Sequence, residues 1–209
     1  MKVAYVSEWR PDEAVARILV EAILGEPTEP IAPPIRTRGW PSVRNLLPAV
    51  LKHVYYGTDA DALVVLVDSN RSPVYTDKDR EGLETKEECR LVQLQKALAE
   101  TQAQLPQLPT RARIKTAVGL AVPAIEAWLL CGVDRNVSEG AWVRALREGR
   151  VPYTKNELKV RVYGSDRAGE VLKTERSIAE ARRLAQDIAL LESKFPIGFG
   201  ALAGDVRAW

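Results

Sequence analysis

The chain has 209 residues, of which 46% are hydrophobic and 28% charged, and its formal net charge is +2. This length suits one sizeable core and is short for two typical domains, and the composition excludes a chain that is mainly disordered. The nearly even charge balance argues against a strongly basic nucleic-acid coat protein and against an acidic solvating protein.

The first 131 residues alternate between short apolar runs and segments with hydrophobic residues at helical spacing. The short runs predict strands at residues 3–6, 63–67 and 114–122, with an edge strand around 35–38. The helical segments predict helices at about 11–25, from 42, at 85–104 and from 123. The run 63–67 is uniformly apolar, so we expect a central strand covered on both faces. This order predicts an α/β fold with a parallel sheet flanked by helices and right-handed crossovers.

From Asp134 onward the strand signals fade. Helices are expected at about 138–148, 173–193 and 199–209. We therefore expect residues 132–209 to form a helical extension that packs on a core of residues 1–131, within a single structural domain.

Charge is distributed unevenly along the chain. The net charge is −3 over residues 1–110 and +6 over residues 111–183. This layout suits a metal site beside a surface that binds a polyanion. The alternative is that the basic residues only form a solvated helical face.

The cysteines and the apolar runs indicate in which cellular compartment the protein is expected. Two cysteines cannot build a disulfide framework or a four-thiolate zinc site, and they fit a reducing environment. No export signal is visible, and the longest nearly apolar run, residues 117–125, is far below the roughly 18 residues that span a bilayer. We expect a cytoplasmic protein that does not enter a membrane.

Oxygen-bearing side chains follow three of the predicted strands. Glu8 lies just past the first strand, Asp68 and Asn70 follow the central strand, and Glu126 lies one turn into the helix after the last strand. Ligands of parallel sheets bind beyond the carboxyl ends of the strands, and oxygen ligands suit a hard cation such as Mg²⁺ or Mn²⁺. The alternative is that these residues only cap loops and helix N-termini.

Four segments resemble TOPRIM-type domains or a family of TOPRIM-like proteins. The stretch from Val6 to Glu13 resembles the signature of the first TOPRIM strand, and Asp68-Ser69-Asn70 resembles the Asp-x-Asp motif of the central strand. The segment Ile125–Leu130 is similar to a Glu-Ala-Trp-Leu segment in a bacterial family of TOPRIM-like proteins that includes relatives of the RloB proteins of restriction and phage-defence loci. Lys159, Tyr163 and Lys173, and then Phe195-Pro196-x-x-Phe199, are similar to the ending of that family, so the resemblance covers most of the chain.

The resemblance implies a Mg²⁺- or Mn²⁺-dependent nuclease or related phosphotransfer protein, acting on nucleic acid and connected with phage defence. It implies that Glu8 is a metal ligand or general base, that Asp68 and Asn70 are metal ligands, and that Glu126 is a further ligand or orients one. Basic residues of the second half are then the phosphate contacts, namely Lys155, Lys159, Arg161, Arg167 and Lys173.

Two other functions remain open from the sequence. Trp9 and Asn70 stand where TOPRIM domains usually have Gly and a second Asp, which favours a non-catalytic module that binds a partner such as an ATPase. A small nucleotide-binding α/β protein is disfavoured, because the chain has no phosphate-binding loop motif.

Overall fold

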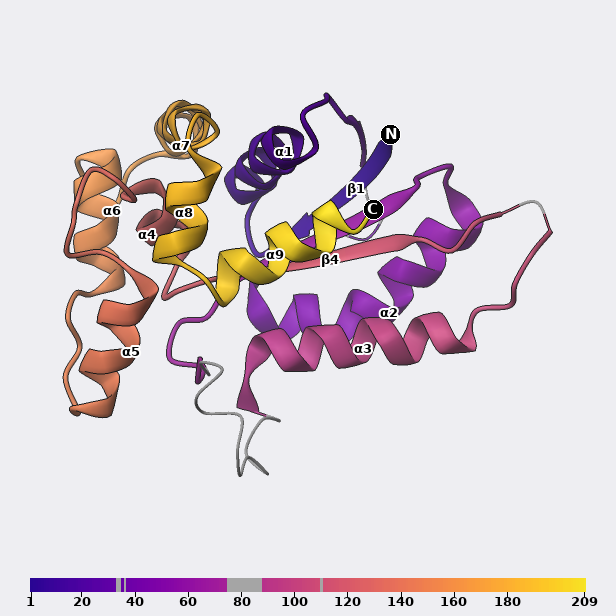
Figure 1. The fold of residues 1–209 in the computed structure, drawn as a ribbon, viewed down its shortest axis with the longest axis horizontal. Coiled ribbons are helices and arrows are strands. Elements are labelled where there is room, and N and C mark those ends of the chain that lie inside the picture. Colours follow the sequence, from indigo (N-terminus) through magenta and orange to yellow (C-terminus); the bar gives the residue numbers. More distant parts are fainter. Residues whose placement is uncertain (33–34, 36, 75–87, 110) are drawn as a thin grey trace.

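A computed structural model of the chain describes residues 1–32, 35, 37–74, 88–109 and 111–209. These residues form nine helices and one four-stranded sheet in which all strands are parallel (Figure 1). The strands are β1 (Lys2–Ser7), β2 (Glu29–Ile31), β3 (Ala62–Asp68) and β4 (Lys115–Ala121). The predicted α/β class with a parallel sheet is confirmed.

The strand order β2-β1-β3-β4 places a topological switch point between β1 and β3. From β1 the chain moves outward to β2 on one side, and from β3 it moves outward to β4 on the other. The connections on either side therefore leave the sheet in opposite directions. In such sheets a crevice opens outside the carboxyl ends of the two central strands, where ligands commonly bind.

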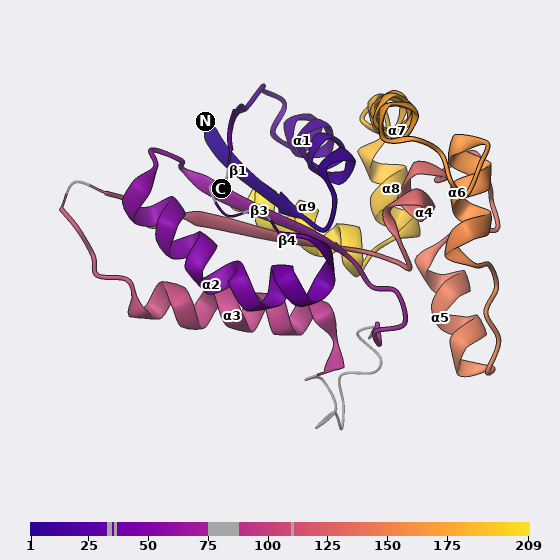
Figure 2. The same ribbon diagram turned by 180° about the vertical axis from the view of Figure 1, so that it is seen from behind.

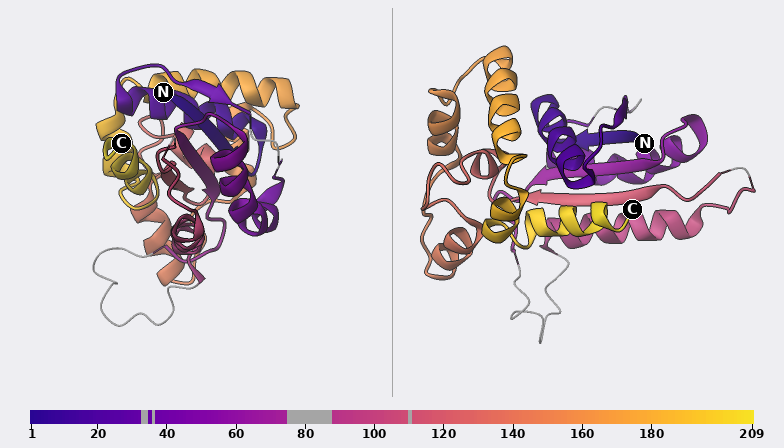
Figure 3. Two further views of the ribbon diagram at one scale, coloured as in Figure 1. Left: turned by 90° about the vertical axis from the view of Figure 1, so that its right-hand side faces the viewer. Right: turned by 45° about the horizontal axis from the view of Figure 1, so that its top comes forward.

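Helices cover both faces of the sheet. Helices α1 (Arg10–Leu24) and α9 (Gly198–Arg207) lie on one face, and α2 (Gly39–Gly57) and α3 (Arg90–Gln104) lie on the other (Figures 2 and 3). Every residue of β3 is buried, as expected for a strand covered on both faces.

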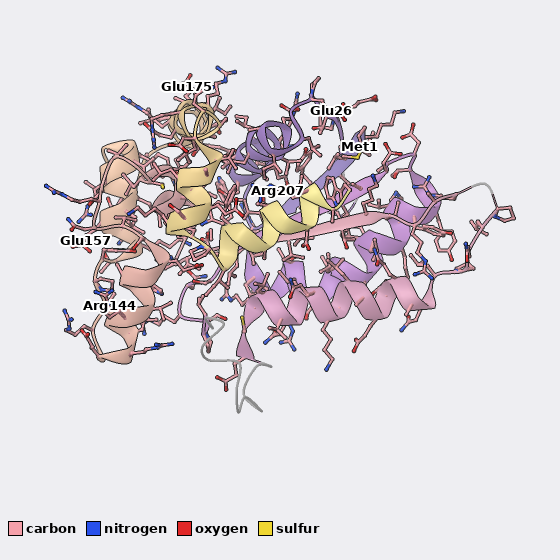
Figure 4. All side chains as sticks on the ribbon, in the orientation of Figure 1. Met1, Glu26, Arg144, Glu157, Glu175 and Arg207 are labelled. Carbon is pink, nitrogen blue, oxygen red and sulfur yellow. The ribbon has the colours of Figure 1, made fainter. Side chains whose placement is uncertain are left out.

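The other five helices gather at the end of the sheet to which the carboxyl ends of the strands point (Figure 1). They are α4 (Ile125–Leu129), α5 (Glu139–Arg147), α6 (Lys155–Tyr163), α7 (Glu170–Leu184) and α8 (Ile188–Lys194). Their outer surfaces carry exposed charged side chains such as Arg144, Glu157 and Glu175 (Figure 4). None of the helices in the described part of the chain is long and apolar enough to cross a membrane. Both cysteines are buried free thiols.

The edge strand lies earlier in the chain than the sequence predicts. It is formed by Glu29–Ile31, which pairs with Lys2–Ala4, and not by residues 35–38, of which residue 36 lies outside the described residues. Pro30 is tolerated because an edge strand needs ladder hydrogen bonds on one side only. The Tyr5 and Thr28 hydroxyls, 2.8 Å apart, fasten the chain just before this strand.

The helical part differs from the prediction in two places. The expected helix over 173–193 is two helices, α7 and α8, because the Asp187 carboxylate accepts a hydrogen bond from the Leu190 N–H and begins a new helix. Helix α6 was not predicted. The start of the predicted helix at 85–104 falls partly on residues 85–87, outside the described residues, and α3 begins at Arg90.

Helix α9 attaches to β4 through a close backbone approach. A methyl group built at Gly198 would lie 1.9 Å from the Leu120 carbonyl oxygen, so the helix can approach this closely only where the residue has no side chain. Farther along, the Asp205 carboxylate accepts a hydrogen bond from the Val118 N–H at 3.1 Å. The C-terminal helix thus fills part of one face of the sheet.

A buried glutamate fixes the start of α9. The Glu139 side chain, on a residue that is 1% exposed, accepts hydrogen bonds from the N–H groups of Ile197 at 2.7 Å and Gly198 at 2.8 Å. Burial raises the pKa of Glu139 to about 7, although the two backbone hydrogen bonds act in the opposite direction. Both carboxylate oxygens are used, so this group joins α5 to α9 as a structural element.

We predict that Gly198→Ala destabilises the fold by about 1–3 kcal/mol or more, because the added methyl group must push α9 away from β4. Gly204→Ala, in the same helix, is the matched control: nothing lies within 4 Å of its added methyl group. The free energy of unfolding of the control should rise by roughly 0.5–1 kcal/mol, because alanine is a better helix former than glycine. Urea unfolding of both variants measures the difference, and equal stabilities would contradict this description of α9.

Candidate active site at the carboxyl edge of the sheet

Glu8 and Asp68 meet at the topological switch point. Asp68 ends β3 and is 7% exposed, and Glu8 directly follows β1. The Asp68 backbone N–H donates a hydrogen bond to Glu8 Oε1 at 3.1 Å. The two residues are 60 positions apart in the chain, and the pairing of their strands brings them together.

Asp68 makes three further contacts. Its Oδ1 accepts a hydrogen bond from the Ile125 N–H at 2.9 Å, at the start of α4. Its Oδ2 is paired with the ammonium group of Lys155, at the start of α6. Its carbonyl oxygen accepts a hydrogen bond from Arg90 Nη1 at 2.6 Å. One residue therefore links β3 to α3, α4 and α6.

Lys155 and Arg90 place two positive charges among these acidic groups. The Lys155 ammonium also lies 3.5 Å from Asn70 Oδ1, and Arg90 Nη1 lies 3.4 Å from Glu8 Oε1. The Arg90 guanidinium stacks 4.6 Å from the centre of the Trp40 ring, which fixes its plane. Asn70 adopts a left-handed backbone conformation with a φ of 51°, which Asn tolerates better than most residues.

Two more carboxylates complete the group. Glu126, on α4, is 4% exposed, and its Oε2 has no hydrogen-bond partner among the described residues. Asp12, in the first turn of α1, is close enough to Asp68 and Glu126 for their charges to repel. We call Glu8, Asp12, Asp68 and Glu126 the carboxylate cluster.

Burial and repulsion from neighbouring carboxylates raise the pKa values of Glu8, Asp12 and Glu126. Burial is the largest cause at Glu8, at Glu126 and at Asp12, and repulsion from Asp68 is the second cause at each. The shift is upward at all three and places the pKa of Asp12 well above its usual range. Burial acts to lower the pKa of Lys155, but attraction to Asp68 and its neighbours outweighs it and raises that pKa. Shifts of this kind, caused by burial together with like charges, are common at functional sites.

The other predicted phosphate contacts lie in different surroundings. Lys159 is near enough to Glu126 to oppose the rise in its pKa. The Lys173 ammonium lies 6.0 Å from the centre of the Trp9 ring, and Trp9 is 40% exposed. Arg161 is instead paired with Asp134 at 2.7 Å.

The arrangement also bears on metal binding. Within the described part of the chain, no three His, Cys, Asp or Glu side chains form a group that could hold a metal ion. The ammonium of Lys155 and the guanidinium of Arg90 supply positive charge to the carboxylates instead.

Two cavities differ in their relation to this region. One of about 800 Å³ lies beside α1 and β2, and its lining includes Arg10, Arg17 and Arg182. The other, of about 510 Å³, adjoins the carboxylate cluster, because Asn70, Arg90 and Lys155 line it. Only the second cavity shares residues with the network around Asp68.

Comparison with known proteins gave no match. No family model, curated protein or solved structure matches this chain. The resemblance to TOPRIM domains therefore stays a prediction from the motifs.

Two residues of the site, Asp12 and Arg90, are not predicted from the sequence. Asp12 lies in the first turn of α1, and only the turn of the chain from β1 into α1 brings it near Asp68 and Glu126. Arg90 gave no signal, because nothing in the local pattern shows that a helix following a long connection begins beside Asp68.

We predict that Glu126→Gln stabilises the folded state more at pH 8 than at pH 5. A carboxyl whose pKa is raised by folding binds more protons when folded, so its contribution to stability falls as the pH rises from the unfolded towards the folded pKa. Glutamine does not titrate, so the variant does not lose this stability as the pH rises.

Urea unfolding at the two pH values measures the effect, with Glu100→Gln, an exposed glutamate of α3, as the control. A stability difference between Glu126→Gln and wild type that does not change with pH would show that Glu126 feels no such environment.

Proposed function

We propose that this protein is a divalent-cation-dependent phosphodiesterase that cleaves nucleic acid at the carboxylate cluster. The observation that supports it most is the joining of Glu8 to Asp68 at the switch point, with Asn70 and Glu126 beside them. Carboxylates in this position and with raised pKa values are typical of functional sites in parallel sheets.

The residues fit a hard cation by the chemistry of their donors. Carboxylate and amide oxygens are the ligands that Mg²⁺ and Mn²⁺ prefer. A buried carboxylate oxygen without a partner among the described residues, Glu126 Oε2, is costly unless some ligand satisfies it. Glu8, Asp68 and Asn70 would hold the ion, and the Lys155 ammonium would compete with it for Asp68, because both are cations.

A bound divalent cation would polarise a phosphoryl oxygen and stabilise the charge that develops on it. The protein's own groups would do the rest. Burial raises the pKa of Glu126, and its position beside Asp68 suits it to act as a general acid or base. Arg90, held between Glu8 and the Asp68 carbonyl, keeps those two acidic strand ends together.

Cations and an exposed aromatic ring near the cluster support a nucleic-acid substrate. Trp9 directly follows Glu8 in the chain. The centre of its ring lies 5.9 Å from the guanidinium of Arg38 and 6.0 Å from the ammonium of Lys173. Lys159 adds positive charge near Glu126. Such groups bind phosphates without regard to base sequence, and an exposed aromatic ring offers a surface for a base.

A second candidate function is a non-catalytic module that binds a partner protein such as an ATPase. The pairing of Asp68 with Lys155 favours it, because a permanent internal cation can replace a metal ion. Val171 of α7, 72% exposed, and Val160 of α6, 48% exposed, are apolar side chains that a partner could cover.

Cleavage assays on single- and double-stranded DNA and RNA with Mg²⁺ or Mn²⁺ distinguish the two functions. If the cluster carries the chemistry, Glu8→Gln and Asp68→Asn should each lower the cleavage rate by roughly 100-fold or more. Binding at low salt should persist or improve, because a negative charge near the phosphates is gone.

Asp166→Asn is the matched control, because it removes the same charge from an exposed position between α6 and α7. It should cleave like wild type. If wild-type protein cleaves none of these substrates, the nuclease function is wrong and the binding module is favoured.

A further inference from the structure

The larger cavity, of about 800 Å³, is bordered by α1, by the edge strand β2 with the residues that follow it, and by α7. Part of its lining is an apolar wall formed by isoleucines of these three segments, among them Ile18, Ile31 and Ile178. These side chains are only partly buried, so they offer apolar surface to an occupant of the cavity. The volume falls within the range of about 300–1,000 Å³ that is usual for ligand sites.

Arginines form another part of the lining. Arg10, the first residue of α1, and Arg182 of α7 are exposed, and neither side chain has an ion pair or hydrogen bond among the described residues. The third arginine, Arg17, is paired with Glu21 at 2.8 Å. Glu13 is the other glutamate of the lining, so three arginines and two glutamates give a net charge of +1. The cavity therefore combines an apolar wall with two guanidinium groups that are available to an anion.

The cavity is connected to the strand end that carries Glu8. The Thr37 hydroxyl, which belongs to the cavity lining, donates a hydrogen bond to the Ser7 carbonyl oxygen at 2.7 Å. Arg10 follows Glu8 by two positions, and Trp9, which lies between them in the chain, has two cations beside its ring. A long anionic ligand that extends from the carboxylate cluster past Trp9 would therefore reach the arginines of the cavity.

We propose that a single strand of nucleic acid extends from the carboxylate cluster past Trp9 into this cavity, where Arg10 and Arg182 contact its phosphates. The inference rests on the proposed function and names its substrate class. A single strand carries an anion at every nucleotide and also exposes the apolar surface of its sugars and bases, so it matches both parts of the lining. In a duplex the bases are stacked and paired and cannot reach the apolar wall.

The test of the phosphate contacts measures binding of a single-stranded oligothymidylate in EDTA at several salt concentrations, so that affinity is determined without cleavage. Each phosphate contact on a single strand contributes about 0.7 to the slope of log affinity against log salt concentration. Arg10→Ala and Arg182→Ala should therefore each flatten the slope by about 0.7 and weaken binding in 0.1 M salt by roughly fivefold. Arg144→Ala, at an exposed position of α5 outside the cavity, is the matched control and should bind like wild type.

Two further probes test the apolar wall. Inorganic polyphosphate carries the anions without sugars or bases, and a DNA duplex of the same length as the oligothymidylate hides its bases. Ile178→Gln replaces a side chain of the apolar wall by a polar one of similar length. It should weaken binding of the oligothymidylate and leave binding of polyphosphate unchanged, a difference that a misfolded variant would not show. Wild-type protein should bind the oligothymidylate more tightly than the duplex.

Salt slopes that are equal in wild type, Arg10→Ala and Arg182→Ala would overturn the inference. So would binding of the duplex as tight as that of the single strand, or an Ile178→Gln variant that binds the oligothymidylate like wild type. The outcome is separable from that of the proposed function. Flattened slopes in a protein that cuts nothing support the strand path and reject the nuclease, and cleavage with slopes that the two arginines do not affect does the reverse.

Discussion

The whole candidate site depends on the position of one carboxylate at the end of the most buried strand. Asp68 uses its N–H, its carbonyl and both side-chain oxygens, and the four bonds go to Glu8 after β1 and to the helices α3, α4 and α6. An ionised carboxylate at 7% exposure is tolerated only when it is paired and hydrogen-bonded in this way. The strand fixes Asp68, and Asp68 in turn fixes Lys155 and Arg90 relative to Glu8.

Two buried glutamates of this protein differ in how fully their carboxylate oxygens are hydrogen-bonded. Both oxygens of Glu139 accept backbone N–H groups, and the group fastens α9 to α5. Glu126 is also buried, but one of its oxygens has no partner in the described residues, and its neighbours include other carboxylates. Burial alone therefore does not single out a site. A buried carboxyl group points to a site when one of its oxygens has no hydrogen-bond partner and like charges lie beside it. Such an arrangement costs stability and is retained where a ligand or a reaction uses it.

The sequence was sufficient to predict the sheet and the meeting of Glu8 and Asp68. An apolar run such as residues 63–67 specifies a buried parallel strand by itself, and parallel strands necessarily bring their carboxyl ends to one edge. The short edge strand was misplaced, because three residues held mainly by backbone pairing leave little trace in side-chain pattern. Helix α6 could have been found from its capping box, Thr154 with Glu157, and from Gly164 at its end.

The parts of the site that could not be predicted come from distant packing. Lys155 was expected to face phosphates, but α6 folds back over the sheet edge and directs its first residue at Asp68, 87 positions earlier. The convergence of Asn70, Trp142 and Tyr153 on one cavity likewise depends on how three separate segments pack. Local pattern holds no information about such contacts, because it specifies elements and not their mutual placement.

The most direct test of the proposal that Glu8, Asp68 and Asn70 hold a divalent cation, for which Lys155 is the internal substitute, is a Mn²⁺ titration. Electron paramagnetic resonance would be used to follow the free ion. Wild-type protein should bind Mn²⁺, Asp68→Asn should bind it more weakly, and Lys155→Met should bind it more tightly, because the competing ammonium is gone. Lys52→Met, at an exposed position of α2, should bind Mn²⁺ like wild type. If Lys155→Met binds no more Mn²⁺ than Asp68→Asn does, Glu8, Asp68 and Asn70 do not form a cation site and the proposal is wrong.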